Sequence, residues 1–459
     1  MSFDNLLRSS RIVGEPNTEL TPEISASLGA AFGTLLKNQG TIVVSRDFRP
    51  ESRMLKRAFV AGVMSAGLNI MDLTAAPIPV LQFAIRRFGT VGGAIFTTHH
   101  SQFKDKIDIK LYSRSGIEYS MKKISNLITI CQQNTIKRGK IGEIGNIIQT
   151  LEINDLYERA ITQFIDKSLF QSLDFRVVAD CSNGPISLII PSILSRVAVD
   201  VVALNSYTPS FFKPLPNFKS LKKLSKVISS TDATFGVCFD VDGSRVIFFD
   251  EKGNYISSDF ILSLFVMEQL KKGSTIFITT MTTTTALEQI IEKVPDAKLT
   301  RVQNNPGMVA NAIQIHRAHF GGSDTGKYRF PEYAFFSDTA LAILKMLELI
   351  AKSGKTLTDL LADVPQAITS RSEIIVSDEI LTNFHEILET NLGNLKIIDT
   401  LIGLKLYFGA EYGWIHVRPS LDEKKLLLTG EIVNPDKGPE MFKTIEYALE
   451  GKITQPFVK

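Results

Sequence analysis

Along most of the chain, short apolar runs rich in β-branched residues alternate with longer segments whose apolar residues recur at helical spacing. This alternation is typical of α/β structure, in which helices cover both faces of a mostly parallel sheet. The first cycle begins at Thr41. It predicts strands at residues 41–45, 68–73, 93–97 and 107–112 and helices at residues 52–66 and 79–88.

Two further cycles of the same kind follow. The second predicts a helix at residues 154–166 and strands at residues 175–179, 199–204 and 234–239. The third predicts a strand at residues 275–279 and helices at residues 259–270, 285–293 and 308–316. Because a single hydrophobic core stops growing beyond about 250–300 residues, three similar units are favoured over one large sheet.

The last part of the chain has a different pattern. Five short strands are predicted at residues 373–376, 396–398, 404–408, 414–418 and 425–428, and two helical segments accompany them. The predicted fold class is therefore α/β, with three similar domains of mixed, mostly parallel sheets and a smaller C-terminal α+β domain. The predicted domains span residues 1–150, 151–255, 256–368 and 369–459.

Composition and charge narrow the possible classes of protein. The chain has 459 residues, of which 44% are hydrophobic, and this is enough to bury a core in each domain. Lys and Arg number 51 against 48 Asp and Glu, and a net charge of +3 is too small to indicate a dedicated nucleic-acid binder. We expect no nucleic-acid partner.

Cysteines and apolar stretches indicate the compartment. Cys131, Cys181 and Cys238 are widely spaced and odd in number, which fits neither a disulfide framework nor a zinc site. Residues 1–11 contain no apolar signal core, and charged residues interrupt the longest apolar region, residues 187–204. We therefore expect a cytoplasmic protein with no membrane partner.

Four polar loops follow predicted strands, and ligands bind at the carboxyl ends of strands in open α/β sheets. The first, residues 97–102, contains His99 and His100 beside three hydroxyl residues. Two adjacent imidazoles fit either a reactive site or a structural pair that hydrogen-bonds the loop backbone. These two interpretations carry equal weight.

The second loop contains Asp240 and Asp242, with Gly243 and Arg245 alongside. Carboxylates at alternate positions can converge on a hard cation such as Mg²⁺, and the guanidinium suits a phosphate. Asp and Gly are also favoured in an ordinary hairpin turn, which is the alternative.

The third and fourth loops offer groups for sugars and anions. In the third, residues 321–330, three glycines flank Ser323, Asp324 and Thr325, which suit sugar hydroxyls. Glycine-rich loops are also common as plain connectors. In the fourth, Arg418 and Ser420 follow a strand and could hold a phosphate. The acidic residues that come next would repel an anion, so a solvated turn is the alternative.

Taken in order and at these spacings, the loops resemble those of the α-D-phosphohexomutase superfamily, which includes phosphoglucomutase, phosphomannomutase and phosphoglucosamine mutase. The resemblance covers nearly the whole chain. Besides the loops, it is carried by residues 19–22, 28–33, 45–52, 75–79, 235–250 and 337–351.

The resemblance implies a heart-shaped, four-domain isomerase that moves phosphate between the C1 and C6 hydroxyls of a hexose. In that mechanism a phosphoserine of domain 1 donates its phosphoryl group, a hexose 1,6-bisphosphate forms, and it turns over in the cleft before returning the other phosphate. Mg²⁺ bridges the phosphoserine and three aspartates of domain 2. The implied partner is a hexose phosphate and the implied cofactor is Mg²⁺, with hexose 1,6-bisphosphate as activator.

Position by position, the resemblance also implies residue roles. The catalytic positions correspond to Arg46, His99, His100 and Lys110. The metal ligands correspond to Asp240, Asp242 and Ser244, and the phosphate-binding positions to Arg418 and Ser420. The substrate-binding positions correspond to Arg245, Ser323, Asp324, Thr325 and Lys327.

Each loop departs from the family pattern at a chemical position. His99 stands where the family has the phosphoryl-carrying serine, and Ser244 stands where it has the third metal-binding aspartate. Ser323 replaces a glutamate that holds two sugar hydroxyls, and residues 421–422 replace a Gly-Thr anion cradle. A family arginine near the N-terminus is not matched, although Arg11 lies close by in the sequence.

Three hypotheses about activity follow. The first is an active mutase in which His99, Thr98 or Ser101 carries the phosphoryl group. A neutral imidazole is a better nucleophile than an unassisted hydroxyl. However, an imidazole reaches farther than a serine side chain, and a displacement of the reacting atom by about 1 Å costs about 10²-fold in rate. The second is a catalytically impaired paralogue that binds sugar phosphates or a protein partner. The third is a phosphatase or phosphotransferase that acts through a phosphohistidine.

Overall fold

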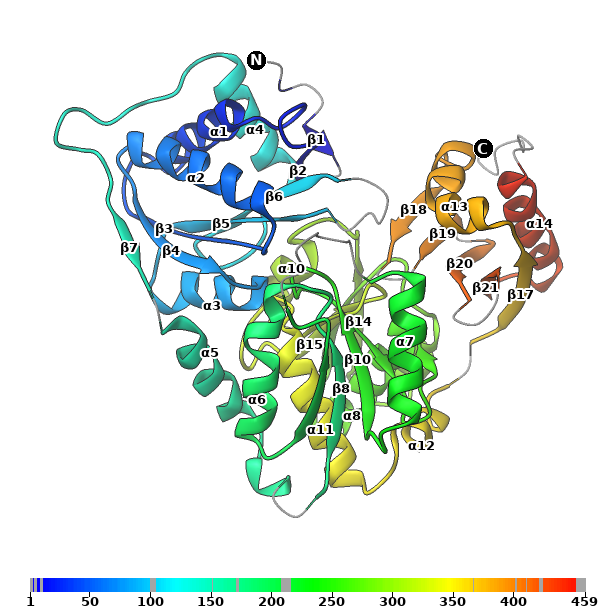
Figure 1. The fold of residues 1–459 in the computed structure, drawn as a ribbon. Coiled ribbons are helices and arrows are strands. Elements are labelled where there is room, and N and C mark those ends of the chain that lie inside the picture. Colours follow the sequence, from blue (N-terminus) through cyan, green and yellow to red (C-terminus); the bar gives the residue numbers. More distant parts are fainter. Residues whose placement is uncertain are drawn as a thin grey trace.

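The computed structural model of the chain describes residues 3, 6–8, 11–99, 105–150, 152–170, 173–207, 216–365, 367–400, 403–409, 411–420 and 424–450. Four β-sheets follow one another along this chain, each with its own helices. The first and fourth units lie on either side above the two central units, which gives a heart-shaped outline (Figure 1). The predicted fold class is confirmed.

The first unit is a seven-stranded mixed sheet in the order β1-β2-β6-β5-β3-β4-β7. Strands β5, β3, β4 and β7 are parallel, whereas β6 runs antiparallel to β5. Its strands are β1 Leu7–Arg8, β2 Arg11–Gly14, β3 Thr41–Arg46, β4 Asn69–Ala75, β5 Gly92–Thr98, β6 Ile107–Ser113 and β7 Ile147–Gln149. Its helices are α1 Pro22–Leu35, α2 Pro50–Ser65, α3 Ile78–Arg87 and α4 Met121–Gln132.

Helices α1 and α2 pack at backbone contact because both carry a glycine at the crossing. A Cβ on Gly29 would lie 2.1 Å from the carbonyl oxygen of Phe59, and a Cβ on Gly62 would lie 1.9 Å from that of Ala26. No larger residue fits at either position without moving a helix.

The second and third units have sheets in the orders β12-β11-β10-β8-β9 and β14-β13-β15-β16. The second sheet consists of β8 Arg176–Asp180, β9 Asp200–Leu204, β10 Phe235–Phe239, β11 Val246–Phe249 and β12 Tyr255–Ile256. The third consists of β13 Ile276–Thr280, β14 Lys298–Val302, β15 Phe320–Ser323 and β16 Lys327–Arg329. The helices of these units are α5 Ile153–Ile161, α6 Ile190–Arg196, α7 Phe218–Ser229, α8 Ser258–Lys271, α9 Ala286–Ile291, α10 Met308–His316, α11 Thr339–Ser353 and α12 Leu357–Ala362.

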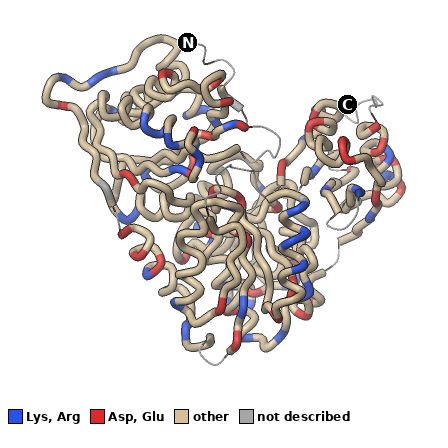
Figure 2. The backbone as a smooth tube through the Cα atoms, viewed as in Figure 1, with Lys and Arg blue, Asp and Glu red and all other residues tan. Residues whose placement is uncertain are grey.

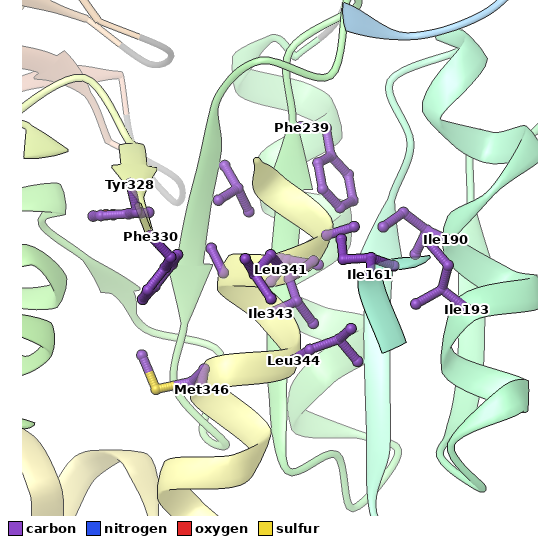
Figure 3. Packing of buried hydrophobic residues seen from close by; sticks show 14 of the residues in the cluster. Ile161, Ile190, Ile193, Phe239, Tyr328, Phe330, Leu341, Ile343, Leu344 and Met346 are labelled. Carbon is purple, nitrogen blue, oxygen red and sulfur yellow. The ribbon is translucent and has the colours of Figure 1, made fainter. Parts of the chain in front are cut away.

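Helix α11 joins the two central cores. It is buried at every position from Thr339 to Ile350, and the two charged residues of this stretch, Lys345 and Glu348, lie 3.5 Å apart as an ion pair. Figure 3 shows Leu341, Ile343 and Leu344 of this helix packed among side chains of the second unit, with Tyr328 and Phe330 nearby. The two central units therefore share one continuous core.

The fourth unit is an antiparallel sheet in the order β17-β21-β20-β19-β18. The strands are β17 Thr369–Ile375, β18 Lys396–Asp399, β19 Leu404–Gly409, β20 Gly413–Pro419 and β21 Lys425–Ile432, and the helices are α13 Asp378–Asn391 and α14 Gly438–Leu449. Side chains alternate between the two faces of a strand, and Ile415 and Val417 pack with Leu388 and Met441 of the helices. The opposite face, with Trp414, faces the third unit.

Most predicted elements are present, and the exceptions have physical reasons. The predicted helix at residues 285–293 was too long: α9 ends at Ile291, because Pro295 has no N–H to donate to the carbonyl of Ile291 and its ring would clash with that carbonyl in a helix. The sequence pattern did not predict helices α1, α4, α6 and α7 or strands β11 and β15. Strand β14 and the start of β17 were not predicted either. Both lie at sheet edges and are rich in polar residues, so they lack an apolar run.

Two further features concern the cysteines and the helices. The three cysteines are buried and free of disulfide bonds. In the part of the chain that the structure describes, no helix is both long enough and apolar enough to cross a membrane.

Candidate active site

The first predicted loop begins at His99, directly after β5. Its imidazole Nδ1 lies 2.6 Å from Oδ1 of Asp108 on the neighbouring strand β6. Asp108 is fully buried. Burial alone would raise the pKa of this carboxyl, but its contacts with His99 and the charges of Lys110 and Arg11 hold the pKa well below its usual range. Because an ionised carboxylate only accepts hydrogen bonds, Nδ1 is the ring nitrogen that carries a proton in this contact.

Thr98 is also fixed by a buried carboxylate. Oδ2 of Asp47 accepts hydrogen bonds from the backbone N of Thr98 at 2.6 Å and from its Oγ1 at 2.7 Å. The other carboxylate oxygen accepts from the backbone N of Arg49 at 3.0 Å. The Thr98 hydroxyl therefore holds the end of β5 in place. The predicted loop residues His100 and Ser101 lie outside the described residues.

The second loop forms a turn between β10 and β11 that its own side chains close. Asp240 accepts hydrogen bonds from the backbone N of Arg245 at 2.9 Å and from Oγ of Ser244 at 3.1 Å. Asp242 accepts from the backbone N of Ser244 at 3.0 Å, and its other oxygen forms an ion pair with Nζ of Lys110. Each of the four carboxylate oxygens thus has a protein partner.

The two aspartates differ in ionisation. Burial and the charge of Asp242 raise the pKa of Asp240 to about 6. Asp242 is equally buried, but the ammonium of Lys110 holds the pKa of this carboxyl far below its usual range. Lys110 comes from the first unit and Asp242 from the second, so this ion pair also connects the two units.

These contacts bear on the Mg²⁺ that the resemblance implies. Mg²⁺ requires nearly octahedral coordination by oxygen ligands. Here two carboxylates and the hydroxyl of Ser244 are present, and a lysine ammonium lies against Asp242. Among the described residues, no group of three or more His, Cys, Asp or Glu side chains could hold a metal ion. The donor set does not fit Mg²⁺ as arranged, and Lys110 supplies positive charge at this position.

Further basic side chains gather around Lys110. A small cavity of about 40 Å³ is lined by Lys110, Glu118, Lys327 and Arg329, among others. Burial, together with repulsion from Arg245 and other nearby cations, lowers the pKa of Lys327 to about 7. Within the described chain, Nε and Nη1 of Arg329 are buried without a hydrogen-bond partner. Such a group favours an anion.

This basic group is a local feature. In Figure 2, acidic and basic residues are mixed over all four units. Arg11 of β2 belongs to the group: its Nε lies 3.0 Å from Glu118, and its Nη1 lies 3.8 Å from Asp108. The sequence had placed Arg11 only near an unmatched family position, whereas the structure brings it to the partner of His99.

The third loop connects β15 to β16. Oγ of Ser323 and Oγ1 of Thr325 lie 2.8 Å apart. Asp324 accepts hydrogen bonds from Thr280 at 3.1 Å and Thr282 at 2.9 Å, and lies 3.5 Å from Nζ of Lys405 in the fourth unit. Asp324 is therefore held between the third and fourth units.

The remaining predicted residues make other contacts. The guanidinium of Arg418 lies 4.7 Å from the ring centre of Tyr255. The backbone N of Ser420 donates a hydrogen bond to the backbone oxygen of Lys425 at 2.9 Å. Arg46 donates to the backbone oxygen of Asp47 at 2.6 Å. The structure thus gathers Lys110, Asp240, Asp242, Ser244, Arg245 and Lys327 near one another, while Arg46 and Arg418 have other contacts.

Sequence reasoning missed Asp108 and Glu118. Asp108 and Lys110 alternate with isoleucine and leucine in β6, where every residue from Ile107 to Tyr112 is buried. Charged residues at positions i and i+2 of a buried strand share one face. That spacing was the available signal. Glu118 lies in an irregular segment after β6 and offered no comparable signal.

Comparisons with known proteins agree with this architecture. Three family profiles match in order, each described as phosphoglucomutase/phosphomannomutase: α/β/α domain I at residues 5–138, domain II at residues 155–253 and domain III at residues 257–368. A phosphoglucomutase/phosphomannomutase of Thermococcus kodakarensis is 30% identical, with 95% of this chain and 98% of the relative covered. A probable phosphoglucosamine mutase of Pyrococcus furiosus is also 30% identical, with 93% of each chain covered.

Solved structures share the fold. A phosphoglucomutase/phosphomannomutase family protein of Burkholderia thailandensis has a TM-score of 0.75 at 21% identity and covers 98% of this chain and 99% of its own. A putative phosphomannomutase of Thermus thermophilus has a TM-score of 0.76 at 19% identity, over 97% of this chain and 99% of its own. From the sequence relatives and the matched domains, this chain belongs to the phosphoglucomutase/phosphomannomutase family of the α-D-phosphohexomutase superfamily.

Proposed function

We propose that this chain is a hexose-phosphate mutase in which His99 carries the phosphoryl group. The observation that carries the proposal is the 2.6 Å contact between Nδ1 of His99 and the buried, ionised Asp108. It fixes the ring, places its proton on Nδ1 and makes Nε2 the nucleophilic atom. His99 also stands where the family resemblance places the phosphoryl-carrying serine.

The proposed transfer has two half-reactions. In the first, the Nε2 lone pair attacks a phosphorus of hexose 1,6-bisphosphate, an N–P bond forms, the P–O bond to the sugar breaks, and the sugar oxygen takes a proton from solvent. In the second, the free C6 hydroxyl of a hexose 1-phosphate attacks the phosphohistidine, the N–P bond breaks, the hydroxyl proton leaves to solvent, and hexose 1,6-bisphosphate forms again. Transfer of its C1 phosphoryl group to His99 then leaves the 6-phosphate. Asp108 stabilises the positive charge that the ring acquires in between.

The nearby basic residues would stabilise the transferring phosphoryl group. Lys110, Arg245 and Lys327 supply positive charge in a largely water-free setting, where it acts most strongly. In enzymes that stabilise developing charge this way, loss of one donor typically costs about 10²–10³ in rate. No step is assigned to Mg²⁺, since Lys110 lies against Asp242.

Phosphorus NMR tests the proposal. The chain would be incubated with glucose 1-phosphate and a trace of glucose 1,6-bisphosphate, with mannose and glucosamine phosphates in parallel. We expect a 6-phosphate to appear, and His99→Gln to abolish its formation. His316→Gln is the matched control, because His316 is exposed on α10, and it should behave like the parent chain. Conversion retained in His99→Gln would contradict the proposal.

A second candidate function is binding of a hexose phosphate without turnover. The contact that favours it is the ion pair of Lys110 with Asp242, which leaves a basic group but not the three-carboxylate metal loop of the family. Calorimetry showing saturable binding of glucose 1-phosphate, together with an unchanged phosphorus spectrum, would support this function. Release of inorganic phosphate would instead indicate a phosphatase.

A further inference from the structure

The small cavity beside Lys110 is lined by residues of three units. Lys110 and Glu118 come from the first unit, Ser244 from the second, and Lys327 and Arg329 from the third. We propose that this cavity binds a small monovalent inorganic anion, chloride, where the three units meet. Arg329 is not among the residues assigned from the family resemblance, and the site does not depend on the proposed phosphoryl transfer.

Arg329 brings a guanidinium to the cavity without a hydrogen-bond acceptor. Lys327 and Arg329 alternate along β16 and share one face of the strand, while Tyr328 between them is buried in the core. Within the described chain, Nε and Nη1 of Arg329 are buried and have no hydrogen-bond partner. Burial lowers the pKa of Arg329 to about 10, so the group is still charged at neutral pH. A buried charge is costly unless it is paired, and an anion would pair it.

The charges around the cavity leave a positive surplus. Glu118 is the one acidic side chain of the described lining, and it already forms an ion pair with Arg11 at 3.0 Å. Lys110 is paired with an aspartate of the second unit. In the part of the chain that the structure describes, Lys327 and Arg329 form no ion pair with an acid. Two cations therefore remain for a ligand.

The first turn of α10 adds backbone donors to the same cavity. Gly307 and Ala310 belong to the lining. The first N–H groups of a helix have no carbonyl partner within it, and they form the positive end of the helix dipole. Gly307 is the N-cap residue and has no side chain, so it does not cap these groups. Helix N-termini favour anions, and this one lies beside a buried guanidinium.

The size of the cavity selects a small ligand. Its volume is about 40 Å³, whereas a single water needs about 10–15 Å³. A halide ion is little larger than a water and fits this space, but a hexose phosphate does not. Ile78, Ile117 and Phe336 complete the lining with hydrocarbon surface. Because moving a divalent phosphate out of water costs more than moving a monovalent ion, chloride is favoured over inorganic phosphate.

Chlorine NMR tests the site directly, because chloride that exchanges with a protein site gives a broadened line. The full chain would be titrated with sodium chloride at constant ionic strength, balanced with sodium gluconate, whose anion is too large for the cavity. We expect excess line width that saturates and that bromide displaces. In Arg329→Gln the affinity for chloride should fall at least about tenfold. Arg114→Gln, which removes an exposed arginine of the first unit, is the matched control and should bind like the parent chain.

Thermal unfolding gives a second readout. An anion that binds only the folded protein raises its unfolding temperature. The parent chain should therefore unfold at a higher temperature in sodium chloride than in sodium gluconate of equal ionic strength, and Arg329→Gln should lose this difference. Lys327→Met should weaken chloride binding as well, so the site can still be tested if Arg329→Gln does not fold.

Three results would overturn the proposal: no saturable line width in the parent chain, unchanged chloride affinity in the folded variants, or displacement of chloride by inorganic phosphate at lower concentrations than by bromide. His99→Gln should keep the chloride signal, which separates this site from the proposed nucleophile. A phosphorus spectrum without conversion would contradict the mutase proposal and leave the chloride titration unaffected.

Discussion

At the scale of single residues, β6 places two opposite charges side by side with different tasks. Asp108 holds His99, and two positions later Lys110 holds Asp242 of the second unit. The resemblance predicted that His99, Lys110 and Asp242 are site residues, because residue types and spacing can be compared directly in the sequence. It did not predict their partners, because an ion pair between residues 132 positions apart depends on how two units pack.

The first prediction concerns Lys110 and the implied Mg²⁺. We expect the parent chain to bind Mn²⁺, used as a paramagnetic substitute for Mg²⁺, only weakly, because an ammonium lies against Asp242. The double variant Lys110→Met with Ser244→Asp restores a third carboxylate and removes the ammonium, so its affinity should rise at least about tenfold. Electron paramagnetic resonance of free Mn²⁺ measures the affinities of the parent chain and of the double variant. Tight binding by the parent chain would contradict this account.

The second prediction concerns pH. The pKa of Lys327 is lowered to about 7, so its ammonium loses its proton as the pH rises through this value. Affinity for glucose 1-phosphate should fall between about pH 6.5 and about pH 8.5, and binding should take up protons, because an anion raises the pKa of a nearby ammonium. In Lys327→Met, calorimetry should find weaker binding at the lower pH and a smaller pH dependence. Identical profiles for the two proteins would refute the assignment.

At the scale of elements, periodicity located many of the strands, but it did not predict helices α1, α4, α6 and α7 or strands β11 and β15, although residues of each lie in a core. It missed β14 and the start of β17, which lie at sheet edges. It also could not show that α1 and α2 touch at Gly29 and Gly62. An isolated glycine in a helical pattern only weakens the prediction of a helix, and the sequence does not show which helix packs against it.

The third prediction tests that helix contact. Gly62→Ala would place a Cβ 1.9 Å from the carbonyl oxygen of Ala26, so the helices must separate. Overpacking of this kind typically destabilises a protein by about 1–3 kcal/mol. Arg57→Ala, at an exposed position of α2, is the control and should change the free energy of unfolding by less than about 0.5 kcal/mol. Urea denaturation measures both, and equal effects would argue against backbone contact.

At the scale of the whole molecule, the units are joined by polar contacts as well as by the shared core around α11. Lys405 of the fourth unit is buried and lies 3.0 Å from Asp259 and 3.5 Å from Asp324 of the third. The sequence predicted four domains in order, because each has its own periodic pattern. The boundaries near residues 150, 255 and 368 stay predictions. The contacts between units were not predictable, since they join charges distant in the chain.

The fourth prediction concerns Lys405. In Lys405→Met, the two buried aspartates lose their shared counter-charge, and breaking a buried ion pair in this way typically costs about 3–5 kcal/mol. Denaturant unfolding should show a large loss of stability, and Lys424→Met, at an exposed ion pair, should show almost none. Similar losses in both variants would contradict a role for Lys405 in joining the units.

The central claim is that His99 carries phosphate, and phosphoryl-group mapping tests it most directly. The chain would be treated with glucose 1,6-bisphosphate and examined by phosphorus NMR and by mass spectrometry of its peptides at alkaline pH. We predict an acid-labile phosphate on His99, absent from His99→Gln and formed at least about 10²-fold more slowly in Asp108→Asn, where the ring loses its orienting carboxylate. An acid-stable phosphate on a serine or threonine, or no phosphate on a chain that still converts substrate, would contradict the claim.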